Sequence, residues 1–176
     1  MKISKETIPE INPNTLAIVG FQDDDGFFTR IVEQDEKDDY ETTWSTHQVM
    51  NYTCKGFGIS LQGLLDGTRM LSGITHKPPI AIDRISGMYF FPVESPLRKS
   101  CTWIAHSHVL EVEREDTHFT RVVFKNGRDI LLNVSYASII NQVYRTAQYR
   151  YLLSNNIEHV LEHSQFVSEP PLHRKR

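Results

Sequence analysis

The sequence has 176 residues, 39% of them hydrophobic and 23% charged, with a formal net charge of -3 at pH 7. This composition is typical of a globular protein with a sizeable core and excludes a disordered chain. Two cysteines are too few for a disulfide scaffold. No apolar run approaches the roughly 20 residues that a membrane span needs, and the N-terminus lacks a signal-peptide pattern. We therefore expect a cytoplasmic protein that does not engage a membrane.

Charge is distributed unevenly along the chain. The first 66 residues hold five Lys and Arg against twelve Asp and Glu, whereas the remaining residues hold fourteen against ten. The acidic residues gather in Asp23-Asp24-Asp25 and between Glu33 and Glu41, where we expect solvated turns. Because such clusters repel phosphate groups, a nucleic-acid partner should bind elsewhere, on the C-terminal two-thirds of the chain.

The N-terminal third is predicted to contain a hairpin and one helix. Residues 1–13 are polar with two prolines and should form a loose arm. Thr15–Phe21 and Phe27–Glu33 are predicted strands, joined by an Asp-Gly turn. Apolar residues recur at helical spacing from Thr46 to Leu65, which predicts a helix that ends at Gly67.

Residues 68–134 contain short apolar runs separated by Gly and Pro, which predicts a series of strands. The pair Asn126-Gly127 between two such runs is a strong hairpin signal. The predicted strands are Arg69–Ile74, Ile80–Asp83, Met88–Val93, Thr102–Glu113, Thr117–Phe124 and Asp129–Val134.

The last predicted element is a helix that begins at Ser135 or Ser138 and runs to about Leu153, with a short further helix within residues 154–165. Its inward residues should be Ile139, Ile140, Val143, Tyr144 and Ala147. The whole order predicts an α+β fold, in which a hairpin and helix precede a curved antiparallel sheet closed by the C-terminal helix. We divide the chain into an arm (1–13), one domain (14–165) and a polar basic tail (166–176).

Catalytic motifs are absent from the sequence. It contains no Gly-x-Ser-x-Gly elbow, P-loop or His-Glu-x-x-His motif, so we expect neither enzymatic activity nor a cofactor. An alternative is a metal-dependent protein, because His106 and His108 would share one face of a predicted strand. Cys101, Cys54 and His76 would then complete a tetrahedral site, although this spacing is generic.

Three groups of basic residues are candidates for nucleic-acid contacts. One precedes a stiff Pro-Pro turn, one follows Pro96, and one lies on the final helix, where a Gln side chain can pair with base edges or phosphates. No helix-turn-helix or zinc-finger signature accompanies them. The candidates are Lys77, Arg98, Lys99 and Arg145, followed by Arg84, Arg150 and Gln142.

Several unusual strings occur together in one order. They are Cys54–Gly58, His76–Ile80, Tyr89–Pro92, Arg98–Cys101, Trp103–Val109 and Asn141–Ala147. In this order and at this spacing they resemble the ComK family, the competence transcription factors of Gram-positive bacteria. The resemblance extends from about residue 15 to residue 153.

This resemblance implies a sequence-specific DNA-binding activator of genes for DNA uptake and recombination. ComK proteins bind paired AT-rich promoter boxes, largely through the minor groove, as dimers of which two make up the promoter complex. The narrow minor groove of A-tracts attracts inserted Arg or Lys, and few contacts there separate A·T from G·C. Our hypothesis is that Lys77, Arg98, Lys99 and Arg145 supply the phosphate and groove contacts.

The resemblance also implies partners other than promoter DNA. One is RNA polymerase. The other is the adaptor MecA, which binds a C-terminal aromatic-aliphatic motif and delivers ComK proteins to the ClpC–ClpP protease. Only Phe166-Val167 is similar to that motif here, so this partner stays open. The expected location is the cytoplasm, in association with the nucleoid. The alternative function is a diverged ComK-like protein-interaction module without DNA binding, which the acidic N-terminal part favours.

Overall fold

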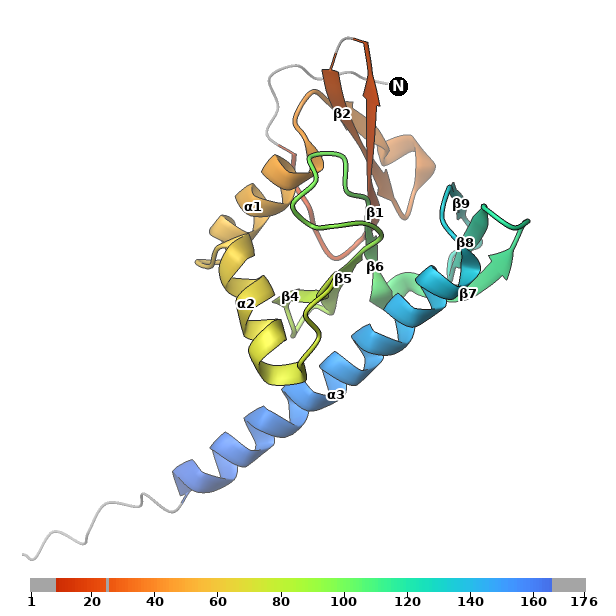
Figure 1. Cartoon of the computed structure of the whole chain (residues 1–176). Helices are drawn as coiled ribbons and strands as arrows, with labels where there is room; N and C mark the ends of the chain where they lie inside the picture. Colours follow the sequence, from red (N-terminus) through yellow and green to blue (C-terminus); the bar gives the residue numbers. More distant parts are fainter. Residues whose placement is uncertain (1–8, 25, 166–176) are drawn as a thin grey trace, which may run out of the picture.

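The computed structural model describes residues 9–24 and 26–165, which form an α+β structure as predicted (Figure 1). The strands are β1 (Thr15–Asp23), β2 (Gly26–Glu33), β3 (Tyr40–Thr42), β4 (Ile80–Asp83), β5 (Met88–Pro92), β6 (Trp103–Ala105), β7 (Val109–Arg114), β8 (Thr120–Phe124) and β9 (Asp129–Leu132). The α-helices are α1 (Thr46–Gly56), α2 (Leu61–Ser72) and α3 (Tyr136–Gln165), and short 3-10 turns lie at Glu36–Asp38 and His106–His108.

The strands form two antiparallel sheets. The larger has the order β3-β2-β1-β6-β5-β4, and the smaller has the order β7-β8-β9. The N-terminal hairpin is therefore part of the larger sheet, because β1 pairs with β6 where Ala17 faces Ile104. The C-terminal helix packs on the larger sheet, as predicted, but neither sheet closes on itself.

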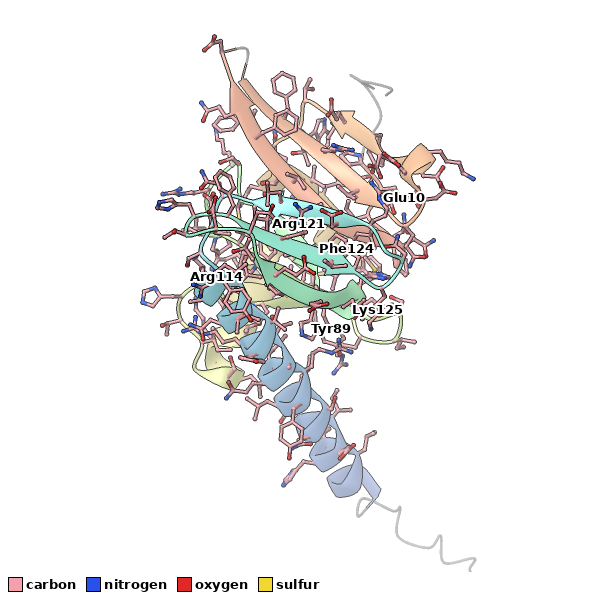
Figure 2. All side chains as sticks on the ribbon, turned by 90° about the vertical axis from the view of Figure 1, so that its right-hand side faces the viewer. Glu10, Tyr89, Arg114, Arg121, Phe124 and Lys125 are labelled. Carbon is pink, nitrogen blue, oxygen red and sulfur yellow. The ribbon has the colours of Figure 1, made fainter. Side chains whose placement is uncertain are left out.

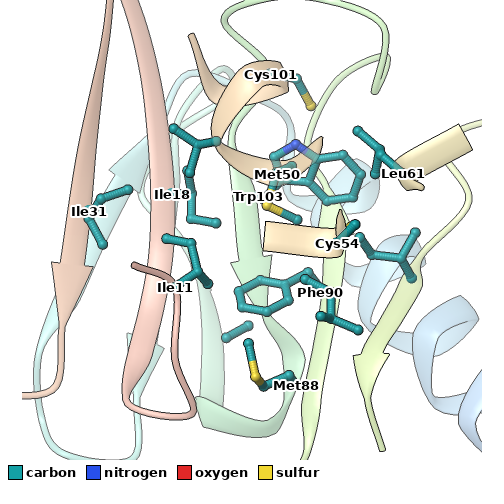
Figure 3. Close-up of a cluster of buried hydrophobic side chains, with 14 of the residues drawn as sticks. Ile11, Ile18, Ile31, Met50, Cys54, Leu61, Met88, Phe90, Cys101 and Trp103 are labelled. Carbon is teal, nitrogen blue, oxygen red and sulfur yellow. The ribbon is translucent and has the colours of Figure 1, made fainter. Parts of the chain in front are cut away.

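Each face of the larger sheet has its own core, because successive residues of a strand point to opposite sides. Phe90 and Trp103 are buried on the side that α1 and α2 cover (Figure 3). Phe91 and Ile104 are buried on the other side, against the smaller sheet and the start of α3, where they meet Phe124. The larger sheet is thus covered on both faces, which explains the continuous apolar run of β5.

The single helix predicted at Thr46–Leu65 is wrong, because this segment forms α1 and the start of α2. Gly58 has φ 77°, a left-handed conformation that ends a helix at little cost only in glycine. Ser60 then begins α2, where its hydroxyl accepts a hydrogen bond from the backbone N–H of Gly63 at 3.0 Å.

The strand predicted at Arg69–Ile74 is also wrong, because α2 continues to Ser72. Gly67 does not end the helix. A glycine inside a helix destabilises it by only about 1 kcal/mol relative to alanine, which the rest of the helix tolerates. The helix ends at Gly73, which has φ 71° and donates its backbone N–H to the carbonyl of Arg69 at 2.9 Å.

The strand predicted at Thr102–Glu113 is divided between the two sheets. The turn His106–His108 separates β6 from β7, and its Ser107 hydroxyl donates to the carbonyl of Gly87 at 2.6 Å. This contact directs the chain out of the ladder of the larger sheet. The hairpin predicted at Asn126-Gly127 is confirmed, because β8 and β9 pair in antiparallel register and Gly127 has φ 87°.

The C-terminal helix is longer than predicted, because α3 runs without a break to Gln165 (Figure 1). Tyr144 and Ala147 were expected to point inward, but both are exposed. The helical period instead places a partly polar stripe against the body. Its buried members are Ile139, Gln142, Thr146 and Tyr149.

Residues 9–13 of the predicted loose arm lie against the domain. Ile11 is buried in the core beside α1, and the hydroxyl of Tyr40 donates to the carbonyl of Glu10 at 3.2 Å. Residues 1–8 and the predicted basic tail at 166–176, with Phe166-Val167, lie outside the described residues. Among the helices described here, none is both long and apolar enough to cross a lipid bilayer.

An ion pair connects the two sheets. Arg128, which follows the β8–β9 turn, binds both carboxylate oxygens of Asp39 at 2.7 and 2.8 Å and the carbonyl of Glu33. Burial alone would raise the pKa of Asp39, but hydrogen bonds from Arg128 and from the backbone of Glu33 hold it below its ordinary value. The acidic stretch between Glu33 and Glu41 was expected to be a solvated turn. Asp35, Glu36 and Asp38 are exposed, as expected, whereas the side chains of Glu33 and Asp39 are buried.

Glu33 makes folding stability depend on pH. Its side chain is 6% exposed, and burial raises its pKa from 4.5 to about 7 although the Thr15 hydroxyl donates to it at 2.9 Å. Between pH 4.5 and about pH 7, Glu33 is protonated in the folded protein and ionised in the unfolded chain. The folding stability therefore falls as the pH rises from 4.5 to about 7. Glu33→Gln keeps an oxygen for Thr15 and removes the titration.

Between pH 5 and pH 8, we expect the free energy of unfolding of the wild type to fall by roughly 2–3 kcal/mol more than that of Glu33→Gln. Urea denaturation at a series of pH values measures it. Glu111→Gln, at an exposed position of β7, is the matched control and should follow the wild type. If the free energies of unfolding of wild type and Glu33→Gln changed with pH in parallel, Glu33 would not be the group whose raised pKa controls stability.

Candidate nucleic-acid interface

Lys77 lies in a strained segment between α2 and β4. Its φ of 50° is the only positive value of a non-glycine residue in the described part of the chain, and Pro78 and Pro79 follow it. The half-buried side chain donates from Nζ to the carbonyl of Val93 at 2.8 Å and lies 3.5 Å from the hydroxyl of Ser138. No carboxylate of the described residues forms an ion pair with it. The result is a partly desolvated cation without a counter-ion.

Gln142 holds this segment against α3. Its side chain is 2% exposed, and its Nε2 donates to the carbonyls of Lys77 at 3.0 Å and of Pro92 at 2.7 Å. We predicted a base contact for Gln142, but both donors of this amide are used inside the protein. Gln142 is therefore a structural residue, and we remove it from the candidates for DNA contact.

A surface pocket of about 330 Å³ opens beside Lys77. We call it the loop pocket, and it is lined by Arg69, Thr75, His76, Lys77, Ser95, Pro96 and Leu97. Arg145 reaches its edge from α3, where Nη1 lies 3.4 Å from the carbonyl of His76. Arg69 also pairs with Asp66 at 2.7 Å, which offsets part of its charge. The pocket thus brings together two cations that the sequence singled out, Lys77 and Arg145, and one that it missed, Arg69.

Arg98 and Lys99 are neighbours in sequence but face different surroundings. Arg98 directly follows the pocket residue Leu97, and its 68% exposed side chain pairs with Glu94 at 3.0 Å. An exposed ion pair of this kind contributes at most about 1 kcal/mol to stability, so the Arg98 side chain can leave Glu94 and bind another anion. The Nζ of Lys99 lies 5.5 Å from the centre of the Phe27 ring, in a separate pocket at the start of α1. Lys99 is therefore not part of the loop pocket.

A second group of cations surrounds Ser107, and we call it the Ser107 cluster. The guanidinium carbon of Arg150 lies 4.3 Å from the centre of the Tyr89 ring, and its Nη1 donates to the Ser107 hydroxyl at 3.2 Å. Lys125 donates from Nζ to the carbonyl of Ser107 at 2.7 Å. Figure 2 shows Tyr89 and Lys125 near each other on this side of the molecule. Arg84, a further candidate, lies exposed after β4.

The predicted pair of metal ligands is not assembled. His106 accepts at Nδ1 from Arg150, so its Nε2 carries the proton and donates to the carbonyl of Val143. Burial, followed by the charge of Arg150, lowers the pKa of His106 to about 4, which keeps the ring neutral. His108 instead binds the carbonyl of Pro13 at 2.7 Å. In residues 9–24 and 26–165 no group of three or more His, Cys, Asp or Glu is arranged to hold a metal ion.

The two cysteines are buried in the core between the larger sheet and its covering helices, and Cys54 is part of α1 itself (Figure 3). Burial raises the pKa of both thiols, Cys54 and Cys101, to about 12. They are therefore protonated and packed as small apolar side chains, which agrees with neither metal ligation nor nucleophilic chemistry.

Gln142→Leu should destabilise the fold by about 1–3 kcal/mol, because two buried carbonyls would lose their donor. Gln148→Leu is the matched control at an exposed position of the same helix, and it should change stability by less than about 0.5 kcal/mol. Urea denaturation measures both. Equal stability of the two variants would show that Gln142 does not hold the segment.

Comparison with known proteins places this chain in a family. The family model described as ComK protein matches residues 5–158. The chain is 34% identical over 168 residues to the competence transcription factor of Bacillus subtilis (strain 168), covering 95% of this chain and 86% of that protein. No solved structure gives a significant match. The extent of both sequence matches shows that the chain belongs to the ComK family.

Proposed function

We propose that this chain is a transcription factor that activates competence genes, and that it binds promoter DNA through the loop pocket and Arg98. The observation that carries the proposal is the half-buried ammonium of Lys77, which has no carboxylate partner among the described residues. Such a group loses hydration without gaining a counter-ion, so an approaching phosphate oxygen supplies a favourable partner. Arg145 and Arg69 reinforce the positive potential at the same opening.

The similarity to the competence transcription factor of Bacillus subtilis supports the same function. The absence of catalytic motifs agrees with it, and the chain is proposed to be a regulator without enzymatic activity. Its place of action is the cytoplasm, in association with the nucleoid.

The proposed target is a pair of AT-rich boxes. A-tracts narrow the minor groove and strengthen its negative potential, which favours an inserted Arg side chain. Arg98 is the best placed to enter the minor groove, because its side chain is exposed and is held only by a surface ion pair with Glu94. Lys77 and Arg145 then contact the phosphates beside the groove. Lys99 can reach DNA only from the separate pocket at the start of α1.

Further partners extend this proposal. A dimer doubles the cationic surface, and two dimers on paired boxes raise the effective concentration of each other. Contact with RNA polymerase completes the activator function. Recognition by the MecA adaptor and the ClpC–ClpP protease would depend on Phe166-Val167, which lie outside the described residues.

One observation argues against the alternative of a protein-interaction module without DNA binding. The acidic N-terminal part, which includes the stretch between Glu33 and Glu41, favoured that alternative. The side chains of Asp39 and Glu33 are buried, and Asp39 pairs with Arg128 and Arg30, whereas Asp35, Glu36 and Asp38 are exposed. Less negative charge therefore faces outward than the sequence indicates.

We expect Arg145→Ala and Lys77→Met to weaken binding to an AT-rich duplex by roughly tenfold together, and each to reduce the salt slope of log K by about 1. Methionine retains the length of the Lys77 side chain. Arg121→Ala is the control with the same change of charge. Arg121 already pairs with Glu115 and Asp129, so its loss should leave binding within about twofold.

Fluorescence anisotropy at two salt concentrations measures these effects, with circular dichroism to check folding. Full affinity in both variants would contradict the assignment of the surface. A wild type that binds AT-rich duplex at neither salt concentration would favour the protein-interaction module.

A further inference from the structure

The outer face of α3 carries no charged side chain over about five turns. Between Tyr136 and Ile157 the helix contains only two charged residues, Arg145 and Arg150, and both are half-buried. Exposed helix faces usually carry Lys and Glu, so this face is unusual for a surface that meets only water. We call it the α3 face, and its exposed members are Ala137, Asn141, Tyr144, Ala147, Gln148, Tyr151 and Asn155.

Two tyrosines dominate the α3 face. Tyr144 and Tyr151 are each 66% exposed, and because they are seven residues apart, two helical turns place both rings on one side. The side chains of Asn141 and Gln148 beside them form no hydrogen bond within the described residues. Protein interfaces are enriched in Tyr and depleted in Lys, Glu and Asp, so this composition is typical of an interface.

The α3 face is accessible to a large partner. The opposite stripe of the helix, which includes Gln142 and Thr146, is buried against the body, so the helix is held in one orientation. Figures 1 and 2 show no other element of the described chain on the outer side of α3, and the last turns of the helix project beyond α2. Another helix can therefore lie along this face.

The lack of charge restricts what can cover the α3 face. A charged partner surface would lose hydration there without gaining a counter-charge, so the partner surface must also be uncharged. The α3 face is complementary to itself in this respect. Tyr144 and Tyr151 are equally distant from the central pair, Ala147 and Gln148, so an antiparallel copy would bring each Tyr144 against Tyr151 of the other chain. Such aromatic pairs favour association, and the small side chain of Ala147 lets the helices approach closely.

The charges at the two ends of the α3 face agree with this antiparallel arrangement. At its N-terminal end the guanidinium carbon of Arg114, on β7, lies 5.4 Å from the centre of the Tyr136 ring. Near its C-terminal end Glu158 is exposed. Neither Arg114 nor Glu158 forms an ion pair within the described residues. Glu111 and Glu113 alternate with Arg114 along β7, so they point to the other face of that sheet.

In an antiparallel pair the N-terminal end of one α3 face meets the C-terminal end of the other. Each Arg114 then approaches Glu158 of the second copy. Within one chain Tyr136 and Glu158 are about 33 Å apart along the helix axis, so the two charges cannot meet inside one molecule.

We propose that the α3 face is the dimer interface of this protein, packed antiparallel on the same face of a second copy about a two-fold axis at Ala147 and Gln148. The inference rests on the proposed function, which includes a dimer, and it names the surface that forms the dimer. An isologous interface of this kind uses one patch on both chains and closes at two copies.

This dimer places both loop pockets on one side. Arg145 and Arg150 lie on opposite flanks of the α3 face, because five residues correspond to about 140° around a helix. Arg145 points to the loop pocket and Arg150 to the Ser107 cluster. The two-fold axis runs across the helices within the interface, so each flank stays on its own side. One duplex can therefore contact both loop pockets at once, and its phosphates relieve the repulsion between their cations.

Ala147→Glu tests the centre of the interface. Residue 147 lies beside the two-fold axis, so the substitution brings two carboxylates together, and we expect the dissociation constant of the dimer to rise about 100-fold or more. Sedimentation equilibrium should show the mass fall from twice the chain mass of 20.4 kDa to that mass. An equal mixture with Ala147→Lys should recover the dimer, because the two charges are then opposite. Gln62→Glu, at an exposed position of α2, is the matched control and should stay dimeric.

An exchange of charges tests the ends of the interface. Arg114→Glu and Glu158→Arg should each raise the dissociation constant by about 3- to 30-fold, because two ion pairs become two like-charged contacts. The double variant should return to within about threefold of the wild type. Since the two positions are distant within one chain, such a recovery reports a contact between chains. Circular dichroism checks the folding of every variant.

The inference is overturned by a wild type that stays monomeric, by Ala147→Glu that stays dimeric, or by a double variant as weak as the single ones. Fluorescence anisotropy with an AT-rich duplex tests the position of the loop pockets. The monomeric Ala147→Glu should bind with lower affinity and with about half the salt slope of the wild type, because one loop pocket then contacts the duplex.

Unchanged affinity and salt slope in the monomeric Ala147→Glu would show that the two loop pockets do not act on one duplex, which also overturns the inference. An unchanged dimer that no longer activates transcription in vitro would assign the α3 face to another protein instead. A wild type that dimerises through this face but binds no duplex would overturn the proposed function and leave the interface standing.

Discussion

The buried amide of Gln142 is the interaction on which the candidate interface depends. It binds two carbonyls that belong to separate elements, Lys77 before β4 and Pro92 at the end of β5. These bonds hold Lys77 in its left-handed conformation and fix α3 against the larger sheet. Because α3 cannot rotate, Arg145 faces the loop pocket and Arg150 faces Ser107. One uncharged side chain thus determines where these three positive charges meet solvent.

Sequence patterns predicted the elements whose signals are local. The Asn126-Gly127 turn needs only its own backbone angles, and the hairpin is confirmed there. The division of the strand at Thr102–Glu113 could not be predicted, because it depends on Ser107 binding Gly87, a residue distant in sequence. The boundary between α1 and α2 did have a local signal, since Ser60 is a good helix cap and Gly58 a good helix end. Apolar periodicity across both helices concealed it.

The candidate site was predictable in part, for a similar reason. Charged residues in turns, such as Lys77 and Arg98, are recognisable from sequence because turns lie at the surface. Arg69 was missed because its helix was taken for a strand. The roles of Gln142 and Asp39 depend on burial and on partners far along the chain, which a sequence does not reveal.

We propose that phosphate groups bind where cations lack carboxylate partners, around α3 and the loop pocket. A crystal structure of the chain bound to an AT-rich duplex would show where the phosphates lie. We expect phosphate oxygens within hydrogen-bond distance of Lys77 Nζ and of the Arg145 guanidinium, with the β1–β2 hairpin free of DNA. A complex in which the duplex lies on another surface, with Lys77 and Arg145 in solvent, would contradict it.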